Sequence, residues 1–169
     1  MFSCLGCEQD IDFPYEGKDR IQFQHFSTVN NKRIYTDSTV FSFGLLNDTI
    51  LIDTAKIVMQ YLGKGSDQER TYNVTIVADS TTAVEGTHYG AFSLVQKFRP
   101  NELTDTLRIV IYREHLNKSF ANPRNECLYL RLQESEDFDL GLRGGISMRL
   151  LLNDYLSEPC LLYTSPSPR

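Results

Sequence analysis

Basic residues are scarce in this sequence: 17 Lys and Arg stand against 22 Asp and Glu in 169 residues, for a formal charge of −5. Binding to the phosphate backbone of nucleic acid needs a basic surface, so we expect no nucleic-acid partner. Long apolar runs are also lacking, because no stretch reaches the roughly 18 residues that a membrane-spanning helix needs. The hydrophobic fraction is nevertheless 41%, too high for a disordered chain. The sequence therefore predicts a mildly acidic globular domain.

Helical periodicity is absent from the middle of the chain, where apolar and polar residues alternate instead. Leu128, Leu130 and Leu132 alternate with more polar neighbours, and residues 71–78 and 107–112 repeat the pattern. A period of two is typical of a strand with one face toward the core. Further strands are expected at residues 20–26, 38–43, 49–62, 91–98 and 145–152. Turn residues such as Asn30-Asn31 and Gly144-Gly145 separate these segments, which predicts an all-β fold, an immunoglobulin-like antiparallel β-sandwich of about 7–8 strands.

Two segments of the chain are ambiguous. Residues 49–62 alternate at first, but their second half carries apolar residues at spacings that also suit a helical turn. Ile, Val and Thr are stiff at χ1 and favour the pleated strand, so we predict one long or bulged strand. Residues 113–120 are expected to form a loop or a single helical turn.

The first residues contain Cys4 and Cys7 in a Cys-x-x-Cys spacing. A redox or zinc function for this motif needs a βαβ context or a second pair of cysteines, and neither follows. The sequence Leu5-Gly6-Cys7 instead matches the end of a bacterial lipoprotein signal, with a small residue before the cysteine that receives lipid. We predict lipidation of Cys7 and assign residues 1–18 to a signal remnant, the lipidated cysteine and a tether; lipidation of Cys4 and an ordinary exposed tail are the alternatives.

The last ten residues, 160–169, resemble the translation of a common transposase sequencing adapter. A Ser/Pro-rich disordered tail is the alternative interpretation of the same string. On the adapter interpretation these residues are an artefact and take no part in the fold. We therefore place the β-sandwich domain at residues 19–153 and assign 154–159 to the start of a C-terminal portion that is cut short.

Catalytic and metal-binding patterns find little support in the sequence. His25, His88 and His115 have no spacing typical of a zinc site, which needs three or four converging donors. Cys127 lies in a predicted strand and is expected to be a packed thiol without a disulfide partner. No serine-centred nucleophile motif and no phosphate-binding glycine loop occur. We therefore predict a protein that is not an enzyme and holds no cofactor.

One acidic cluster follows the predicted strand around Leu130. It contains Glu134, Glu136, Asp137 and Asp139. Calcium prefers six to eight oxygen ligands, so these carboxylates form a weak candidate calcium site. A solvated acidic turn is the favoured interpretation of the cluster.

The most distinctive segment is 80–89, Ser-Thr-Thr-Ala-Val-Glu-Gly-Thr-His-Tyr. Gly86 suits a turn that needs positive φ, Thr81 and Thr82 can bond to turn backbone, and Tyr89 is expected to bury its ring. A structural role is the favoured interpretation of this segment.

Segment 80–89, together with residues 15–23, 98–102, 106–109 and 128–132, resembles a family of Bacteroidetes lipoproteins that carries the domain of unknown function number 4843. The resemblance covers about residues 7–159. It implies an immunoglobulin-like sandwich similar to Calx-beta domains.

This resemblance also implies a location and a role. It places the protein at the outer membrane through a lipid anchor, with Glu8 and Asp10 resembling a signal for export to the cell surface. Such proteins often accompany polysaccharide uptake, which implies a glycan or a surface protein as the partner. The alternative is a calcium-stabilised adhesion module like a Calx-beta domain, although His88 stands where those domains usually have Asp.

Exposed aromatic rings would supply stacking for sugars. The candidates in this sequence are Tyr15, Tyr35, Phe41, Tyr112 and Tyr129. Packing in the core explains aromatic residues more often than ligand binding does.

Overall fold

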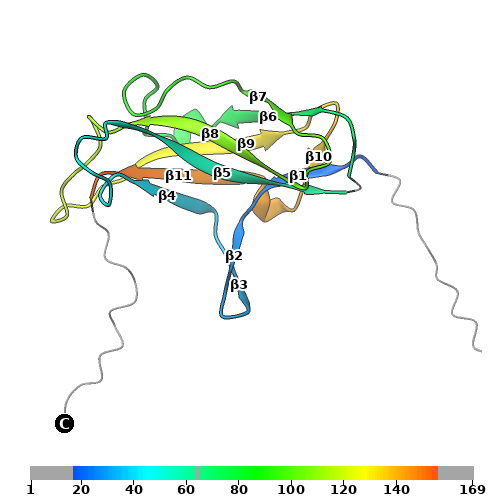
Figure 1. Ribbon diagram of the computed structural model, residues 1–169, viewed down its shortest axis with the longest axis horizontal. Coiled ribbons are helices and arrows are strands. Elements are labelled where there is room, and N and C mark those ends of the chain that lie inside the picture. Colours follow the sequence, from blue (N-terminus) through cyan, green and yellow to red (C-terminus); the bar gives the residue numbers. More distant parts are fainter. Residues whose placement is uncertain (1–16, 64, 156–169) are drawn as a thin grey trace, which may run out of the picture.

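Strands dominate the computed structural model, which describes residues 17–63 and 65–155 (Figure 1). One sheet has the order β10-β1-β5-β8. Its members are β1 (Arg20–Phe23), β5 (Ile52–Leu62), β8 (Thr104–Tyr112) and the short β10 (Asp139–Leu140). The long β5 confirms the prediction of a single strand in this part of the chain. It pairs with β8 over nine residue pairs, from Ile52 opposite Tyr112 to Gln60 opposite Thr104.

The facing sheet has the order β4-β11-β9-β6-β7. Its members are β4 (Ser38–Ser42), β6 (Arg70–Ile76), β7 (Val95–Phe98), β9 (Glu126–Gln133) and β11 (Ser147–Asn153). Two short 3-10 turns, Ala78–Ser80 and Arg143–Gly145, accompany these strands. The described residues contain no helix long and apolar enough to cross a membrane. The two facing sheets establish the predicted all-β, immunoglobulin-like sandwich.

The chain crosses between the two sheets after β1, and a hairpin is inserted at the crossing (Figure 1). The hairpin consists of β2 (Phe26–Val29) and β3 (Lys32–Tyr35), which pair only with each other. Its turn residues Asn30 and Asn31 have φ of 50° and 61°, the left-handed conformation that a two-residue hairpin loop needs. The backbone N–H of Thr36 donates to the carbonyl of His25 over 2.8 Å, so the chain returns to the point at which it left.

The sequence predicts an antiparallel sandwich, but the sheets also contain parallel strand pairs. The crossing explains the first of these pairs. β1 is antiparallel to β5, but β4 continues on the opposite sheet and meets β11 in parallel. A second parallel pair joins β1 to the two-residue β10. The predicted strand 20–26 is also wrong in detail, because it ends at Phe23 and the hairpin begins at Phe26.

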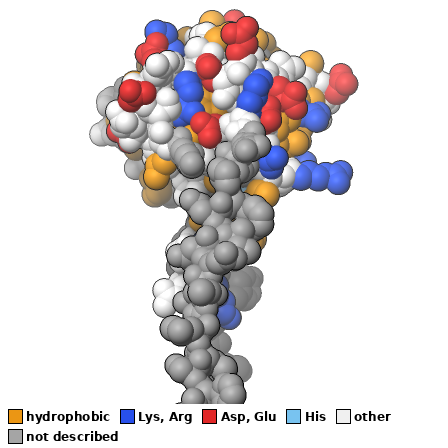
Figure 2. Space-filling view, turned by 90° about the vertical axis from the view of Figure 1, so that its right-hand side faces the viewer, with side chains coloured by type: hydrophobic (Ala, Val, Ile, Leu, Met, Phe, Trp, Pro, Cys, Tyr) orange, Lys and Arg blue, Asp and Glu red, His pale blue; other side chains and the backbone are white. Residues whose placement is uncertain are grey.

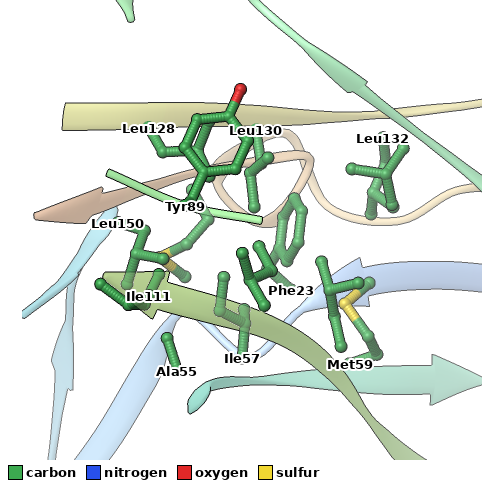
Figure 3. Packing of buried hydrophobic residues seen from close by; sticks show 14 of the residues in the cluster. Phe23, Ala55, Ile57, Met59, Tyr89, Ile111, Leu128, Leu130, Leu132 and Leu150 are labelled. Carbon is green, nitrogen blue, oxygen red and sulfur yellow. The ribbon is translucent and has the colours of Figure 1, made fainter. Parts of the chain in front are cut away.

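The core lies between the sheets and is filled by inward-facing residues of both (Figure 3). Burial alternates along β8 and β9, as their sequence patterns predict. Leu107, Ile109, Leu128 and Leu130 are fully buried. Burial of each such side chain contributes roughly 1.5–3 kcal/mol, so the inward-facing residues of β8 and β9 contribute strongly to stability.

The segment 80–89 has a structural role, as expected. Thr81 Oγ1 donates to the carbonyl of Val77 and accepts from the N–H of Tyr129, so it joins the segment to β9. Gly86 has a φ of +78°, which favours glycine. Tyr89 is buried and belongs to the hydrophobic core cluster (Figure 3). Burial raises the pKa of its phenol.

Candidate functional site

A pocket of about 500 Å³ lies at the base of the β2–β3 hairpin. It is lined by His25, Tyr35, Thr36, Asp37 and Gly144. These residues come from the two ends of the hairpin and from the 3-10 turn that precedes β11. Because the inserted hairpin and the sandwich meet here, the pocket has walls from both.

His25 forms the buried floor of this pocket and is only 6% exposed. Its Nδ1 lies 3.3 Å from the carbonyl oxygen of Phe23, and a carbonyl only accepts, so the contact favours a proton on Nδ1. Nε2 is then an acceptor. It lies on the side of Gly144, where an added Cβ would be 3.7 Å away.

Gly145 makes room for this histidine. A Cβ on Gly145 would lie 2.8 Å from Nδ1 of His25 and 3.1 Å from the carbonyl oxygen of Phe23. The backbone carbonyl cannot move aside without disturbing β1. Glycine at position 145 is therefore required by close approach.

Tyr35 stands over this floor and is 64% exposed. Its ring centroid is 5.5 Å from that of His25, at an angle of 32°. Its ring centroid is also 6.2 Å from that of Phe26, which in turn lies 6.0 Å from that of His25, so the three rings form a triangle. The guanidinium of Arg33 lies over the Phe26 ring, 5.0 Å from its centroid. His25, Tyr35, Phe26 and Arg33 thus form one contiguous cluster, which we call the hairpin cluster.

Polar groups border the pocket on the other side. The carboxylate of Asp37 accepts from the Arg149 guanidinium over 2.7 Å, and both side chains are partly exposed. Arg149 also lies over the ring of Tyr129. The backbone N–H of Arg149 donates to the carbonyl of Asp37. The hydroxyl of Thr36 donates to the carbonyl of Ser38, which fixes the chain where it enters β4.

Of the aromatic residues proposed from the sequence and described by the structure, only Tyr35 lines this pocket. Phe41 is half-buried and its ring packs against Phe43 at 5.2 Å. Tyr112 and Tyr129 are also half-buried, in β8 and β9. Tyr15 lies outside the described residues. Sequence reasoning missed His25 and Phe26 as partners of Tyr35. For Phe26 the Asn30-Asn31 turn was an available signal, because it sets Phe26 opposite Tyr35.

The acidic cluster after β9 does not converge. Asp137 accepts from the N–H and the hydroxyl of Thr71, whereas Glu134 and Glu136 are exposed. Asp139 belongs to β10 beside β1. Over residues 17–63 and 65–155, no group of three or more His, Cys, Asp or Glu could hold a metal ion.

This end of the sandwich carries acidic and basic side chains interspersed rather than a patch of one sign (Figure 2). Several are paired: Arg70 with Asp19 at 2.7 Å, and Lys97 with Glu69 at 2.7 Å. Carboxylates that are already paired with basic side chains are typical of an ordinary solvated surface rather than of a cation site.

The opposite end of the sandwich is closed by a buried ion pair. The guanidinium of Arg113 donates to Asp154 over 2.8 Å and to the carbonyls of Asn47 and Ile50. The hydrogen bond with Asp154 raises the pKa of Arg113 above its usual range. Every donor is directed at this chain's own backbone or carboxylates, so the arrangement ties three loops together.

The remaining candidates are structural or lie outside the described residues. His88 Nδ1 accepts from the N–H of Val84, and His115 is exposed on a loop. Cys127 is a free, half-buried thiol; burial raises its pKa, which makes it a poor nucleophile. Cys7 lies outside the described residues.

Comparison with solved structures supports the fold. The chain is similar to the apo form of the Calx CBD1 domain, with 16% identity, a TM-score of 0.51, and coverage of 82% of this chain and 98% of that one. It is also similar to the calcium binding domain CBD12 of CALX1.1, with 14% identity, a TM-score of 0.50, and coverage of 80% and 45%.

A third similar structure is a protein from Bacteroides ovatus described as a "putative carbohydrate binding protein". The identity is 12%, the TM-score 0.50, and the coverage 81% of this chain and 37% of that one. A search of curated protein sequences found no match. A family model, however, matches residues 15–163. The chain therefore belongs to the family defined by the domain of unknown function DUF4843.

Proposed function

We propose that this protein is a non-catalytic, lipid-anchored surface protein that binds a glycan at the base of the β2–β3 hairpin. The observation that carries the proposal is the exposed ring of Tyr35 above the buried ring of His25 in a pocket of about 500 Å³. A tyrosine supplies a rigid apolar face at little entropic cost, which suits the apolar face of a sugar ring.

The polar groups around Tyr35 fit the same ligand. Asp37 in the pocket lining offers carboxylate acceptors, its ion-pair partner Arg149 offers donors next to it, and Nε2 of a neutral His25 offers an acceptor beside Gly144. Sugar hydroxyls both donate and accept, so a neutral set with both kinds of group is complementary to them. The name of the Bacteroides ovatus neighbour is consistent with this role.

The proposal is tested by a polysaccharide array followed by calorimetry. We expect Tyr35→Ala to weaken binding about tenfold or more, because the stacking surface is lost. Tyr35→Phe keeps the ring and should retain most of the affinity. Phe120→Ala is the matched control, since Phe120 is similarly exposed at 59% but lies in the β8–β9 loop. Absence of binding to every polysaccharide would contradict the glycan role and leave a surface protein as the partner to test by pull-down.

The lipid anchor and the association with polysaccharide uptake are separate parts of the proposal. Lipidation of Cys7 predicts that Cys7→Ala releases the protein from the outer-membrane fraction of cells. A soluble wild-type protein, or a retained variant, would contradict the anchor. Neighbouring genes for uptake of a polysaccharide would support the association.

The fold likeness to CBD12 of CALX1.1 favours a second candidate, a calcium-stabilised adhesion module. It would use Glu134, Glu136, Asp137 and Asp139. An unchanged melting temperature in calcium and in chelator would exclude it. The separation of these carboxylates makes it the weaker candidate.

A further inference from the structure

The hairpin differs in charge from the rest of the chain. Residues 26–35 contain Lys32 and Arg33 and no carboxylate, whereas the whole sequence has a formal charge of −5. All four residues of β3 are exposed. The hairpin therefore presents a local positive charge to solvent beside the sugar-sized pocket.

Register places the charge on the same face as the rings. Phe26 pairs with Tyr35 and Thr28 with Arg33, and cross-strand partners of an antiparallel pair share a face. Consistently, the Arg33 guanidinium lies 5.0 Å from the centroid of the Phe26 ring. The hairpin cluster thus joins the buried ring of His25 to the exposed guanidinium of Arg33 through Phe26.

The donors of Arg33 remain available. Among the described residues, Arg33 has no hydrogen bond or ion pair, and its contact is with the ring of Phe26. Stacking holds the plane of a guanidinium while its N–H groups stay free, and the planar fork suits a carboxylate or sulfate. Arg149, by contrast, is already neutralised by Asp37 at 2.7 Å.

We propose that the hairpin cluster selects acidic glycans, with a sugar ring on Tyr35 and the carboxylate or sulfate of a neighbouring sugar on Arg33. The inference rests on the proposed glycan-binding function and adds its ligand class. In this arrangement Arg33 binds the charged group of the ligand, whereas the groups that line the pocket bind sugar hydroxyls.

The test compares pairs of related polysaccharides in which one member carries more negative charge than the other. Polygalacturonate is compared with its methyl-esterified form, and chondroitin sulfate with unsulfated chondroitin, by calorimetry on the full chain. We expect one acidic member to bind about fivefold tighter than its uncharged or less charged partner, with affinity falling as salt rises.

Variants assign the preference to one side chain. Arg33→Gln should bring the two members of the pair to equal affinity without loss of the melting temperature, and Arg33→Lys should restore part of the preference. Arg108→Gln is the matched control, because Arg108 is an exposed arginine on β8, two strands from β1.

The outcomes separate the two proposals. Binding to neutral polysaccharides with equal or weaker binding of the acidic forms overturns the acidic preference and leaves the glycan function intact. A preference that survives Arg33→Gln overturns the role of Arg33. Binding to no polysaccharide at all overturns both.

Discussion

The sandwich and the hairpin use strands in opposite ways. In β8 and β9 alternate residues are buried against the facing sheet, whereas every residue of β3 is exposed. The hairpin is attached by its two ends, through the Thr36 to His25 hydrogen bond and the N–H of Gln24 on the carbonyl of Val58. Stability is therefore concentrated in the sheets, and the proposed ligand-binding surface is concentrated in the hairpin.

The largest expected effect on stability is in the core. Leu130 is 0% exposed, so Leu130→Ala should lower the free energy of unfolding by about 3 kcal/mol through lost burial and a cavity. Urea denaturation measures the change, and Val110→Ala on the exposed face of β8 is the control, with a smaller loss. Binding at 25 °C should be unchanged. A weakened affinity in folded Leu130→Ala protein would break the separation between the two regions.

Gly145→Ala tests the place where the two regions meet. The added Cβ would press on His25 and on the Phe23 carbonyl, so we expect a loss of about 1–3 kcal/mol in stability and weaker glycan binding as well. Gly65→Ala is the matched control, because a Cβ there meets nothing within 4 Å. Wild-type affinity in the Gly145→Ala protein would show that the floor of the pocket does not contact the ligand.

Alkaline pH acts on the sandwich through Tyr72. Burial, with a smaller effect of the Asp105 charge, raises the pKa of this phenol in the folded state. The unfolded chain therefore loses its proton first as the pH rises above about 10, and stability falls by at most about 1.4 kcal/mol per pH unit. Tyr72→Phe removes this contribution, so its stability should fall less steeply between pH 9 and 11. Parallel pH profiles for both proteins would contradict the assignment.

Removing the hairpin should have the smallest effect on stability. The carbonyl of His25 and the N–H of Thr36 are 2.8 Å apart, so a short Gly-Ser linker can replace residues 26–35. A two-stranded hairpin is marginally stable alone, and we expect a change of less than about 1 kcal/mol in the free energy of unfolding. Glycan binding should be lost. Urea denaturation and calorimetry of the shortened protein check this prediction. An unchanged denaturation midpoint together with lost glycan binding would show that the sandwich supplies the stability and the hairpin supplies the binding.

The sandwich could be predicted because burial on one face leaves a period of two in the sequence, as at Leu128, Leu130 and Leu132. The hairpin strands leave no such mark, because both faces of β3 are exposed. The predicted strand 20–26 ran through His25 for this reason, although Asn30-Asn31 was identified as a turn. Tyr35 was one of several candidate rings. Its partner His25 could not be found, since their contact depends on how the hairpin leaves β1.

The position of the hairpin at the sheet crossing has a consequence for the evolution of this domain. β1 pairs with β5, and β4 with β11, through residues that all lie outside the insertion. Mutations that lengthen, shorten or replace the hairpin therefore leave the register of both sheets intact. With the proposed binding role, the hairpin can change without a conflict with folding, and we expect relatives that share the sandwich to diverge most in this loop. The same property makes residues 26–35 the natural place to graft a new binding sequence.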